Sequence, residues 1–191
     1  RDATGLADYA GFIDSIVAQS AERSRWQELA WRDDLTSLRN RRFFEQALHE
    51  LLDRALRERL RVTVVLFDID DFKHYNDRFG HETGDGLLRE VATLLTRCSR
   101  ESDFVARYGG DEFVVVLWDA EKPRVPGSQH PHDVFALADR FRTAISEHSF
   151  RCLGKQAPGP VTLSGGLACF PWDGKTAAEL MRAADEALLR A

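Results

Sequence analysis

The chain has few cysteines, no long apolar run and no excess of positive charge, and each shortage excludes a class of protein. Its three cysteines stand far apart without the paired spacing of zinc sites, and an odd number cannot complete a disulfide framework. We therefore expect reduced thiols. No run of about 18 apolar residues occurs, which excludes a transmembrane helix within this sequence. A net charge of −5 argues against a general nucleic-acid-binding surface.

The remaining composition is that of a globular protein. Of the 191 residues, 43% are hydrophobic and 30% are charged, which suits one domain with an accessory segment. The chain does not begin with methionine, and we expect it to be a fragment of a longer protein.

The first 32 residues have the pattern of a long helix. Residues 4–32 contain no proline, and eight positions recur at alternating steps of four and three: Leu6, Ala10, Ile13, Val17, Ser20, Ser24, Gln27 and Trp31. This heptad pattern predicts a parallel coiled coil that joins the domain to an upstream sensor. A single amphipathic helix packed on its own domain is the alternative. We take residues 1–32 as a signalling helix and residues 33–191 as the main domain.

The main domain alternates helical stripes with apolar strands. Counting the N-terminal helix first, the predicted order of the chain is helix, helix, strand, two helices, hairpin, helix, strand, helix. This order is typical of an α+β fold in which helices cover a mainly antiparallel sheet. The stretch from Asp119 to Asp133 contains three prolines and predicts a long surface loop. The last strand is predicted to begin at Val161 and to be loosened by Gly165 and Gly166.

The most informative stretch runs from Arg107 to Phe113. It contains two glycines and then two acids, with apolar strand formers on both sides. The pattern predicts a β-hairpin whose tip, free of side-chain bulk, lets a phosphate and its metal approach the backbone. An ordinary hairpin with a solvated acidic turn is the alternative.

A second acidic cluster follows a buried strand. Val62 to Phe67 is nearly continuous apolar sequence and leads directly into Asp68. If this strand neighbours the hairpin, Asp68 and Asp111 converge at one sheet edge and repel each other unless a divalent cation neutralises them. Mg²⁺ binds one or two carboxylates together with phosphate oxygens, so a metal-bound nucleoside triphosphate is the predicted ligand. Ion pairs with arginines are the alternative: Arg41, Arg42 or Arg107.

Three ordered motifs resemble the GGDEF-domain family of diguanylate cyclases. The signature is Gly109-Gly110-Asp111-Glu112-Phe113; a second motif runs from Asp68 to Asp85, and an opening motif from Asp33 to Arg42. Residues 161–168 and 184–188 resemble the closing segments. The resemblance implies a palm-like fold, related to class III nucleotide cyclases, that condenses two GTP into cyclic di-GMP and two pyrophosphates.

The resemblance also implies residue roles. Asp68, the carbonyl of Ile69 and Asp111 would hold Mg²⁺ or Mn²⁺, and Asp111 or Glu112 would help to remove the proton of the attacking hydroxyl. The remaining matched positions fall into three groups. The backbone of Phe72 and Lys73 would bind the phosphates. Asn76 and Asp85 would bind guanine, with His81 beside the nucleotide. The inhibitory product would bind Arg100, Asp103 and Arg140.

The expected partners follow from these roles. They are GTP, cyclic di-GMP as product and inhibitor, a second copy held through the N-terminal helix, and an upstream sensor, with no nucleic acid. A cytoplasmic location is expected, although the parent protein could be anchored in a membrane upstream.

The sequence departs from the family pattern at several places. Ser37 replaces a usual glycine, Gly165 an aliphatic residue and Leu189 a tyrosine, and the chain stops at Ala191, before the basic residues that would clamp the outer phosphates. A catalytically silent receptor for GTP or cyclic di-GMP is therefore the alternative function. A mixed GMP–AMP product is disfavoured, because Asp85 is retained.

Overall fold

The computed structural model describes residues 28–118, 133–156 and 159–191. The chain divides into two compact units, residues 1–32 and residues 33–191. In the described part of the first unit, the amides of Trp31 and Arg32 bond to the carbonyls of Glu28 and Leu29, as in a helical turn. Nearly all of the predicted coiled coil, and of the loop predicted over residues 119–133, lies outside the described residues.

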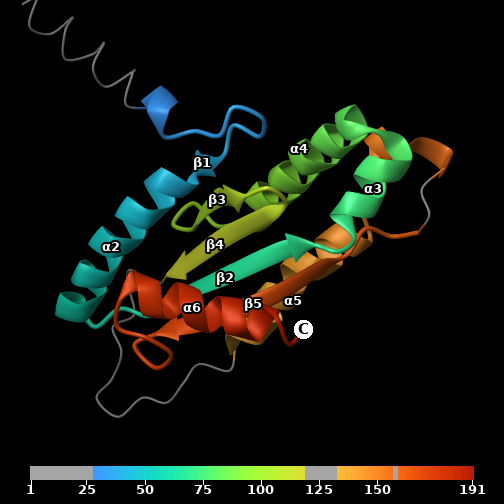
Figure 1. Cartoon of the computed structure of the whole chain (residues 1–191). Coiled ribbons are helices and arrows are strands. Elements are labelled where there is room, and N and C mark those ends of the chain that lie inside the picture. Colours follow the sequence, from blue (N-terminus) through green and yellow to red (C-terminus); the bar gives the residue numbers. More distant parts are fainter. Residues whose placement is uncertain (1–27, 119–132, 157–158) are drawn as a thin grey trace, which may run out of the picture. The chain divides into compact units, whose positions relative to one another are not determined.

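The second unit is built on a five-stranded sheet in the order β1-β3-β4-β2-β5 (Figure 1). The strands are β1 (Arg39–Asn40), β2 (Val62–Ile69), β3 (Phe104–Gly109), β4 (Glu112–Trp118) and β5 (Leu163–Phe170). Strands β1 and β3 pair in parallel, and the other neighbouring strands pair antiparallel. The predicted α+β fold with a mainly antiparallel sheet is confirmed. Strand β1 is an addition to the predicted order.

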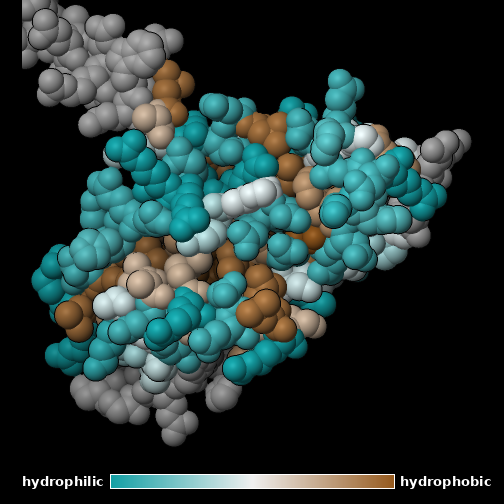
Figure 2. Space-filling model, viewed as in Figure 1, coloured by the Kyte–Doolittle hydropathy of each residue, from teal (hydrophilic) through white to brown (hydrophobic). Residues whose placement is uncertain are grey.

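Helices cover both faces of this sheet. They are α2 (Arg41–Glu58), α3 (Phe72–Phe79), α4 (His81–Cys98), α5 (Asp133–Ser146) and α6 (Ala177–Leu188), with a short 3₁₀ helix η1 (Arg151–Gln156) before β5. Helices α2 and α6 pack on one face, and α3, α4 and α5 pack on the other. Figure 2 shows apolar residues gathered between α2 and α6 within a largely polar surface. No helix in the described ranges is long and apolar enough to cross a bilayer.

Strand β2 is apolar except at Thr63 and Asp68, because both of its faces are buried. Val62, Val64 and Leu66 belong to the core beneath α2 and α6, whereas Val65 and Phe67 belong to the core beneath α4 and α5. Successive side chains of a strand point to opposite faces, so a central strand between two helical layers favours apolar residues at nearly every position. This burial fixes the register that carries Asp68 to the end of the strand.

Local signals set where the flanking helices begin. The side chain of Asn40 accepts a hydrogen bond from the amide of Phe43 at 3.0 Å and caps α2. Thr176 and Glu179 form a capping box at the start of α6. Asn40 also belongs to β1, so a single residue ends the first strand and begins the first helix of the domain.

The two glycines of β5 do not loosen the strand, contrary to the prediction. The strand begins at Leu163 rather than at Val161, and its pairing with β2 continues without a bulge through Gly165 and Gly166. A Cβ atom on Gly166 would overlap the backbone of α6 at Ala184, and one on Gly165 would lie 2.9 Å from the ring of Phe67. The glycines are required because helix and ring pack directly on the strand backbone.

Candidate functional site

Two acids from distant parts of the sequence meet at one end of the sheet. Strand β2 pairs with β4 so that Asp68 lies opposite Glu112. Gly110 and Asp111 form the two-residue turn between β3 and β4, and Glu112 is the first residue of β4. The buried strand and the hairpin are therefore neighbours, as predicted. Three carboxylates lie at this end of the sheet, which we call the acid edge: Asp68, Asp111 and Glu112.

The electrostatics of this edge are unfavourable without a ligand. Burial, followed by the charges of Asp111, Glu112 and Asp70, raises the pKa of the Asp68 carboxyl to about 6. Within the described residues, no ion pair shorter than 4.0 Å joins Asp68 or Asp111 to a basic side chain. The edge therefore has an excess of negative charge, and no ion pair in the described residues neutralises Asp68 or Asp111.

The arginines proposed as alternative partners are engaged elsewhere. Arg107 pairs with Asp33 at 3.1 Å. Arg41 pairs with Glu45 at 2.8 Å and lies over the ring of Tyr108. Arg42 is exposed and forms no ion pair with these acids. The ion-pair alternative is therefore wrong for Asp68 and Asp111.

The donor set of the acid edge suits a hard cation that shares its coordination with a substrate. No group of three His, Cys, Asp or Glu side chains in the described ranges is arranged to hold a metal by itself. Two carboxylates with a backbone carbonyl at Ile69 leave several positions for water and phosphate oxygens, which is how Mg²⁺ is usually bound. The clustered charge and the raised pKa of Asp68 fit such an ion.

Helix α3 begins immediately beside this edge. Asp71 adopts a left-handed conformation with φ of 55°, which turns the chain sharply from the end of β2 into the helix. The amides of Phe72 and Lys73 lie in the first helical turn, where no intrahelical acceptor exists. Asp70 is held on the other side by the hydroxyls of Thr162 and Ser164. This arrangement supplies free amides where the prediction expects phosphates.

The candidates for guanine recognition gather at the junction of α3 and α4. Gly80, with φ of 85°, separates the two helices. A Cβ atom on Gly84 would overlap the side-chain oxygen of Asn76, so Asn76 presses directly on the helix backbone next to Asp85. His81 is exposed at the first position of α4. The structure thus places Asn76 against the turn of α4 that carries Asp85, with His81 at the start of the same helix.

The predicted inhibitory residues meet at the other end of α4. The amide of Arg100 donates to the carboxylate of Asp103 at 2.9 Å, and the amide of Asp103 donates to the carbonyl of Arg100. From α5, the guanidinium of Arg140 donates to the carbonyl of Cys98 at 2.6 Å. All three side chains therefore belong to one region, away from the acid edge.

Sequence reasoning missed two polar clusters. Arg107 links Asp33 to the turn between β3 and β4, and Glu90 binds His148 together with the amides of Arg151 and Cys152. Asp33 carried a signal, since it belongs to the opening motif. Glu90 carried none, because its donors lie about 60 positions away in an irregular connection.

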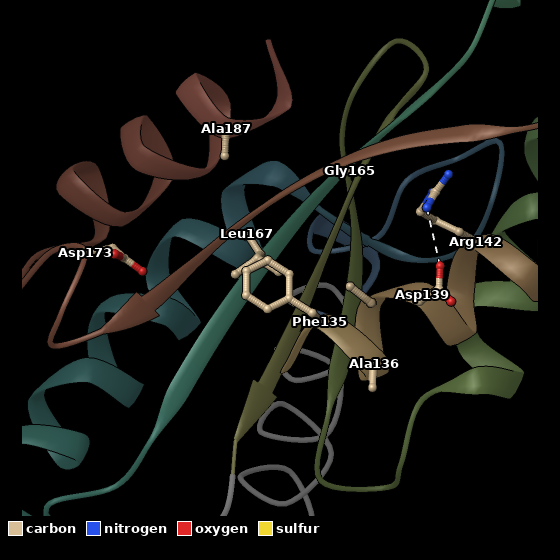
Figure 3. A pocket seen from close by; sticks show the side chains of 9 residues that line it. Phe135, Ala136, Asp139, Arg142, Gly165, Leu167, Asp173 and Ala187 are labelled. Atoms are coloured by element: carbon tan, nitrogen blue, oxygen red, sulfur yellow. Dashed lines mark hydrogen bonds and ion pairs between the residues drawn. The ribbon is translucent and has the colours of Figure 1, made fainter. Parts of the chain in front are cut away.

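A separate cavity of about 710 Å³ lies along β5 between α5 and α6 (Figure 3). Phe135 and Leu167 face each other there, and Arg142 pairs with Asp139 at 3.3 Å. None of the predicted site residues lines this cavity. The candidate site is instead the open acid edge of the sheet.

The comparisons with known proteins agree with the sequence motifs. The family model for the GGDEF domain of diguanylate cyclases matches residues 30–191. The chain is 37% identical over 164 residues to the response regulator PleD of Caulobacter vibrioides, covering 86% of this chain and 34% of PleD. It is 35% identical over 185 residues to the bifunctional diguanylate cyclase/cyclic di-GMP phosphodiesterase MucR of Pseudomonas aeruginosa, covering 93% of this chain and 24% of MucR. It therefore spans only about a quarter to a third of these relatives.

Solved structures show the same architecture. The coiled coil and GGDEF domain of DgcB from Caulobacter crescentus, in complex with c-di-GMP, superposes with a TM-score of 0.77 at 26% identity, covering 96% of this chain and 92% of that one. The GGDEF domain of TpbB from Pseudomonas aeruginosa superposes with a TM-score of 0.72 at 38% identity, covering 84% of this chain and 87% of that one.

Proposed function

The chain belongs to the GGDEF-domain family of diguanylate cyclases, and we propose that it condenses two GTP molecules into cyclic di-GMP and two pyrophosphates. The observation that carries the proposal is the acid edge. Asp68 and Asp111 lie together without a basic partner in the described chain, next to the free amides that begin α3. A divalent cation bound to a triphosphate satisfies both features at once.

The residues at this edge have complementary roles in the proposal. Asp68, the carbonyl of Ile69 and Asp111 would hold Mg²⁺ or Mn²⁺, which when bound stabilises charge on the reacting phosphate. The amides of Phe72 and Lys73 orient the phosphates. Proximity of a correctly oriented hydroxyl to the α-phosphorus then supplies much of the rate.

Each condensation forms one phosphodiester bond and releases one pyrophosphate. The 3′-hydroxyl of one GTP attacks the α-phosphorus of the other, the bond to pyrophosphate breaks, and Asp111 or Glu112 accepts the hydroxyl proton. A second, symmetric step closes the ring. Asn76 and Asp85 accept the N1 and N2 hydrogens of guanine and exclude adenine, which has no N2 donors, while His81 lies beside the nucleotide.

The symmetry of the product requires two half-sites. One domain has one acid edge, so two copies related by a two-fold axis would place two GTP molecules face to face. The heptads of residues 4–32 would keep the copies at an effective concentration on the order of millimolar, and an upstream sensor would act through this helix.

Turnover of GTP by the full chain tests the proposal. With GTP and Mg²⁺, chromatography should show cyclic di-GMP and pyrophosphate in a ratio of one to two, and ATP should give no comparable product. Asp111→Asn should lower the rate by about 10³-fold or more, with an unchanged thermal unfolding midpoint. If wild-type protein binds GTP but forms no product, the chain is a receptor and not a cyclase.

Product inhibition is the second part of the proposal. Arg100, Asp103 and Arg140 combine guanidinium groups, which bind phosphate and the Hoogsteen edge of guanine, with a carboxylate that accepts from its N1 and N2 hydrogens. Because this region lies away from the acid edge, inhibition would be noncompetitive with GTP.

Arg100→Ala should raise the cyclic di-GMP concentration needed for inhibition more than about tenfold, or 1.4 kcal/mol, with near-normal initial rates. Arg97→Ala, an exposed neighbour in the last turn of α4, is the control. Calorimetry and progress curves on both variants measure the effect. Equal product affinity in the two variants would mean that the Arg100–Asp103 pair is only structural.

A further inference from the structure

Arg107 connects two segments that are 74 positions apart. It lies in β3, just before the two glycines, and its Nη1 donates to both carboxylate oxygens of Asp33, at 3.1 and 3.2 Å. The side chains of Arg107 and Asp33 are only 17% and 22% exposed. A shielded, doubly bonded pair of this kind is stronger than an ordinary surface ion pair.

The other side of the same guanidinium holds the turn between β3 and β4. Nε and Nη2 of Arg107 both donate to the carbonyl of Gly110, at 3.0 and 2.7 Å. Gly110 immediately precedes Asp111. Arg107 therefore uses three of its nitrogens, one toward Asp33 and two toward the backbone of the turn.

Asp33 is fixed independently of Arg107. Its Oδ1 accepts hydrogen bonds from the amide and the hydroxyl of Thr36, at 2.8 and 2.7 Å, and its own amide donates to the carbonyl of Leu38. Burial by itself would raise the pKa of the Asp33 carboxyl, but the bonds from Thr36 and Arg107 outweigh it and leave the pKa below its ordinary value. Asp33 is therefore a charged side chain that has hydrogen-bond partners besides Arg107.

The two glycines give the turn no side chain that could pack against the rest of the domain. A Cβ atom on Gly110 would meet no described atom within 4 Å, and one on Gly109 would meet only the carboxylate of Glu112, the residue with which Gly109 pairs across the hairpin. Two glycines in succession allow many backbone conformations. The repulsion among Asp68, Asp111 and Glu112 favours conformations in which Asp111 swings away from the edge. Without a brace, the turn would relax in that direction.

We propose that Asp33 is a positioning residue for Asp111 and acts through Arg107. By fixing the guanidinium, Asp33 holds the carbonyl of Gly110 and so keeps the carboxylate of Asp111 beside that of Asp68, ready for a divalent cation. The inference rests on the proposed function, because it assigns the metal to this edge. A positioning residue of this type raises the affinity for the ion, because the site is already formed before the ion binds.

Metal affinity of the full chain, measured apart from turnover, tests the inference. Calorimetry with Mn²⁺ in the presence of a non-hydrolysable GTP analogue should give a dissociation constant about tenfold higher for Asp33→Asn than for wild type. Asparagine preserves size and can still accept from Thr36, but it lacks the charge that holds Arg107. Asp34→Asn, an exposed neighbour without a described partner, is the matched control and should bind Mn²⁺ like wild type.

A second variant guards against a folding defect in the first. Arg107→Lys keeps the positive charge but cannot bond to Asp33 and Gly110 together, and it should weaken Mn²⁺ binding to a similar extent. The double variant Asp33→Asn/Arg107→Lys should be no worse than either single one, because both changes break the same connection. Thermal unfolding of each variant separates loss of metal affinity from loss of fold.

The outcomes separate the inference from the function on which it rests. If wild type makes cyclic di-GMP while Asp33→Asn and Asp34→Asn bind Mn²⁺ equally, the function stands and the positioning role is refuted. If wild type binds no Mn²⁺ with the nucleotide, both fail. The inference would also be overturned if the losses of Mn²⁺ affinity in the two single variants added up in the double variant. Additive losses would mean that Asp33 and Arg107 act independently.

Discussion

Asp68 and Glu90 are both partly buried carboxylates, yet their surroundings are opposite. Asp68 faces other acids, and burial followed by their charges raises its pKa to about 6. Burial acts on Glu90 in the same direction, but hydrogen bonds from the amides of Cys152 and Arg151 and from His148 outweigh it and lower its pKa. The three bonds to Glu90 measure 3.0, 3.1 and 3.1 Å.

The difference distinguishes an acid that stabilises the fold from one that awaits a ligand. Glu90 joins α4 to η1 and has its partners within the chain, so its charge favours the folded state. Asp68 has no such partner in the described residues, so its charge opposes folding until a cation binds. Carboxyl groups that have a perturbed pKa and no partner in the chain cluster at functional sites. Asp68 is such a group, and it also belongs to one of the family motifs.

The largest effect expected from this comparison is that of Asp68→Asn. Turnover should fall by about 10³-fold or more. The metal-free protein should nevertheless become more stable at pH 7, because a neutral amide removes the repulsion. Denaturant unfolding in the presence of a chelator measures the second effect.

The pH dependence of this stability gain follows from the raised pKa of Asp68. A carboxyl whose pKa is raised by folding destabilises the folded state wherever it is charged. The advantage of Asp68→Asn should therefore be complete above pH about 6 and disappear as the pH falls toward the ordinary aspartate pKa of about 3.9. A variant that is less stable than wild type at pH 7 would show that Asp68 is a structural acid like Glu90.

Much of the acid edge could be predicted because its signals are local. A short stretch of sequence is enough to recognise the apolar strand that leads into Asp68, and the same holds for the Gly-Gly hairpin that carries Asp111. Only the adjacency of the two had to be assumed. The helix faces and most of the order of elements along the chain followed from periodicity in the same way. The family resemblance then supplied the roles that spacing alone cannot.

The parts that could not be predicted depend on distant partners. Strand β1 has only two residues and forms because β3 offers its edge, not because Arg39 and Asn40 favour a strand. The alternative in which Arg107 pairs with the acids of the edge is wrong, because in the folded chain Arg107 pairs with Asp33. Gly166 was interpreted as a weakness because the approach of α6 has no trace in the local sequence.

The smaller effect, from Glu90→Gln, tests the other side of the comparison. Glutamine keeps one acceptor oxygen but loses the charge. Its NH2 group must replace either the oxygen that accepts from Cys152 or the one that accepts from Arg151, so one of these amides faces a donor. The free energy of unfolding should fall by about 1–3 kcal/mol. Turnover per folded molecule should stay within about twofold of wild type, because Glu90 contacts none of the proposed substrate-binding residues. Glu186→Gln, at an exposed position of α6, is the control for loss of a glutamate charge.

The pH dependence of Glu90→Gln should be the reverse of that expected for Asp68→Asn. Because folding lowers the pKa of Glu90, its stabilising contribution is complete above the ordinary glutamate pKa of about 4.3 and is lost as the pH falls through the lower folded value. Wild type should therefore lose its advantage over Glu90→Gln in acid, whereas Asp68→Asn loses its advantage over wild type there. Denaturant unfolding of both pairs from pH 7 down to pH 3 measures the two trends. If Glu90→Gln unfolds like Glu186→Gln but abolishes turnover, Glu90 belongs to the catalytic machinery and the contrast between the two acids collapses.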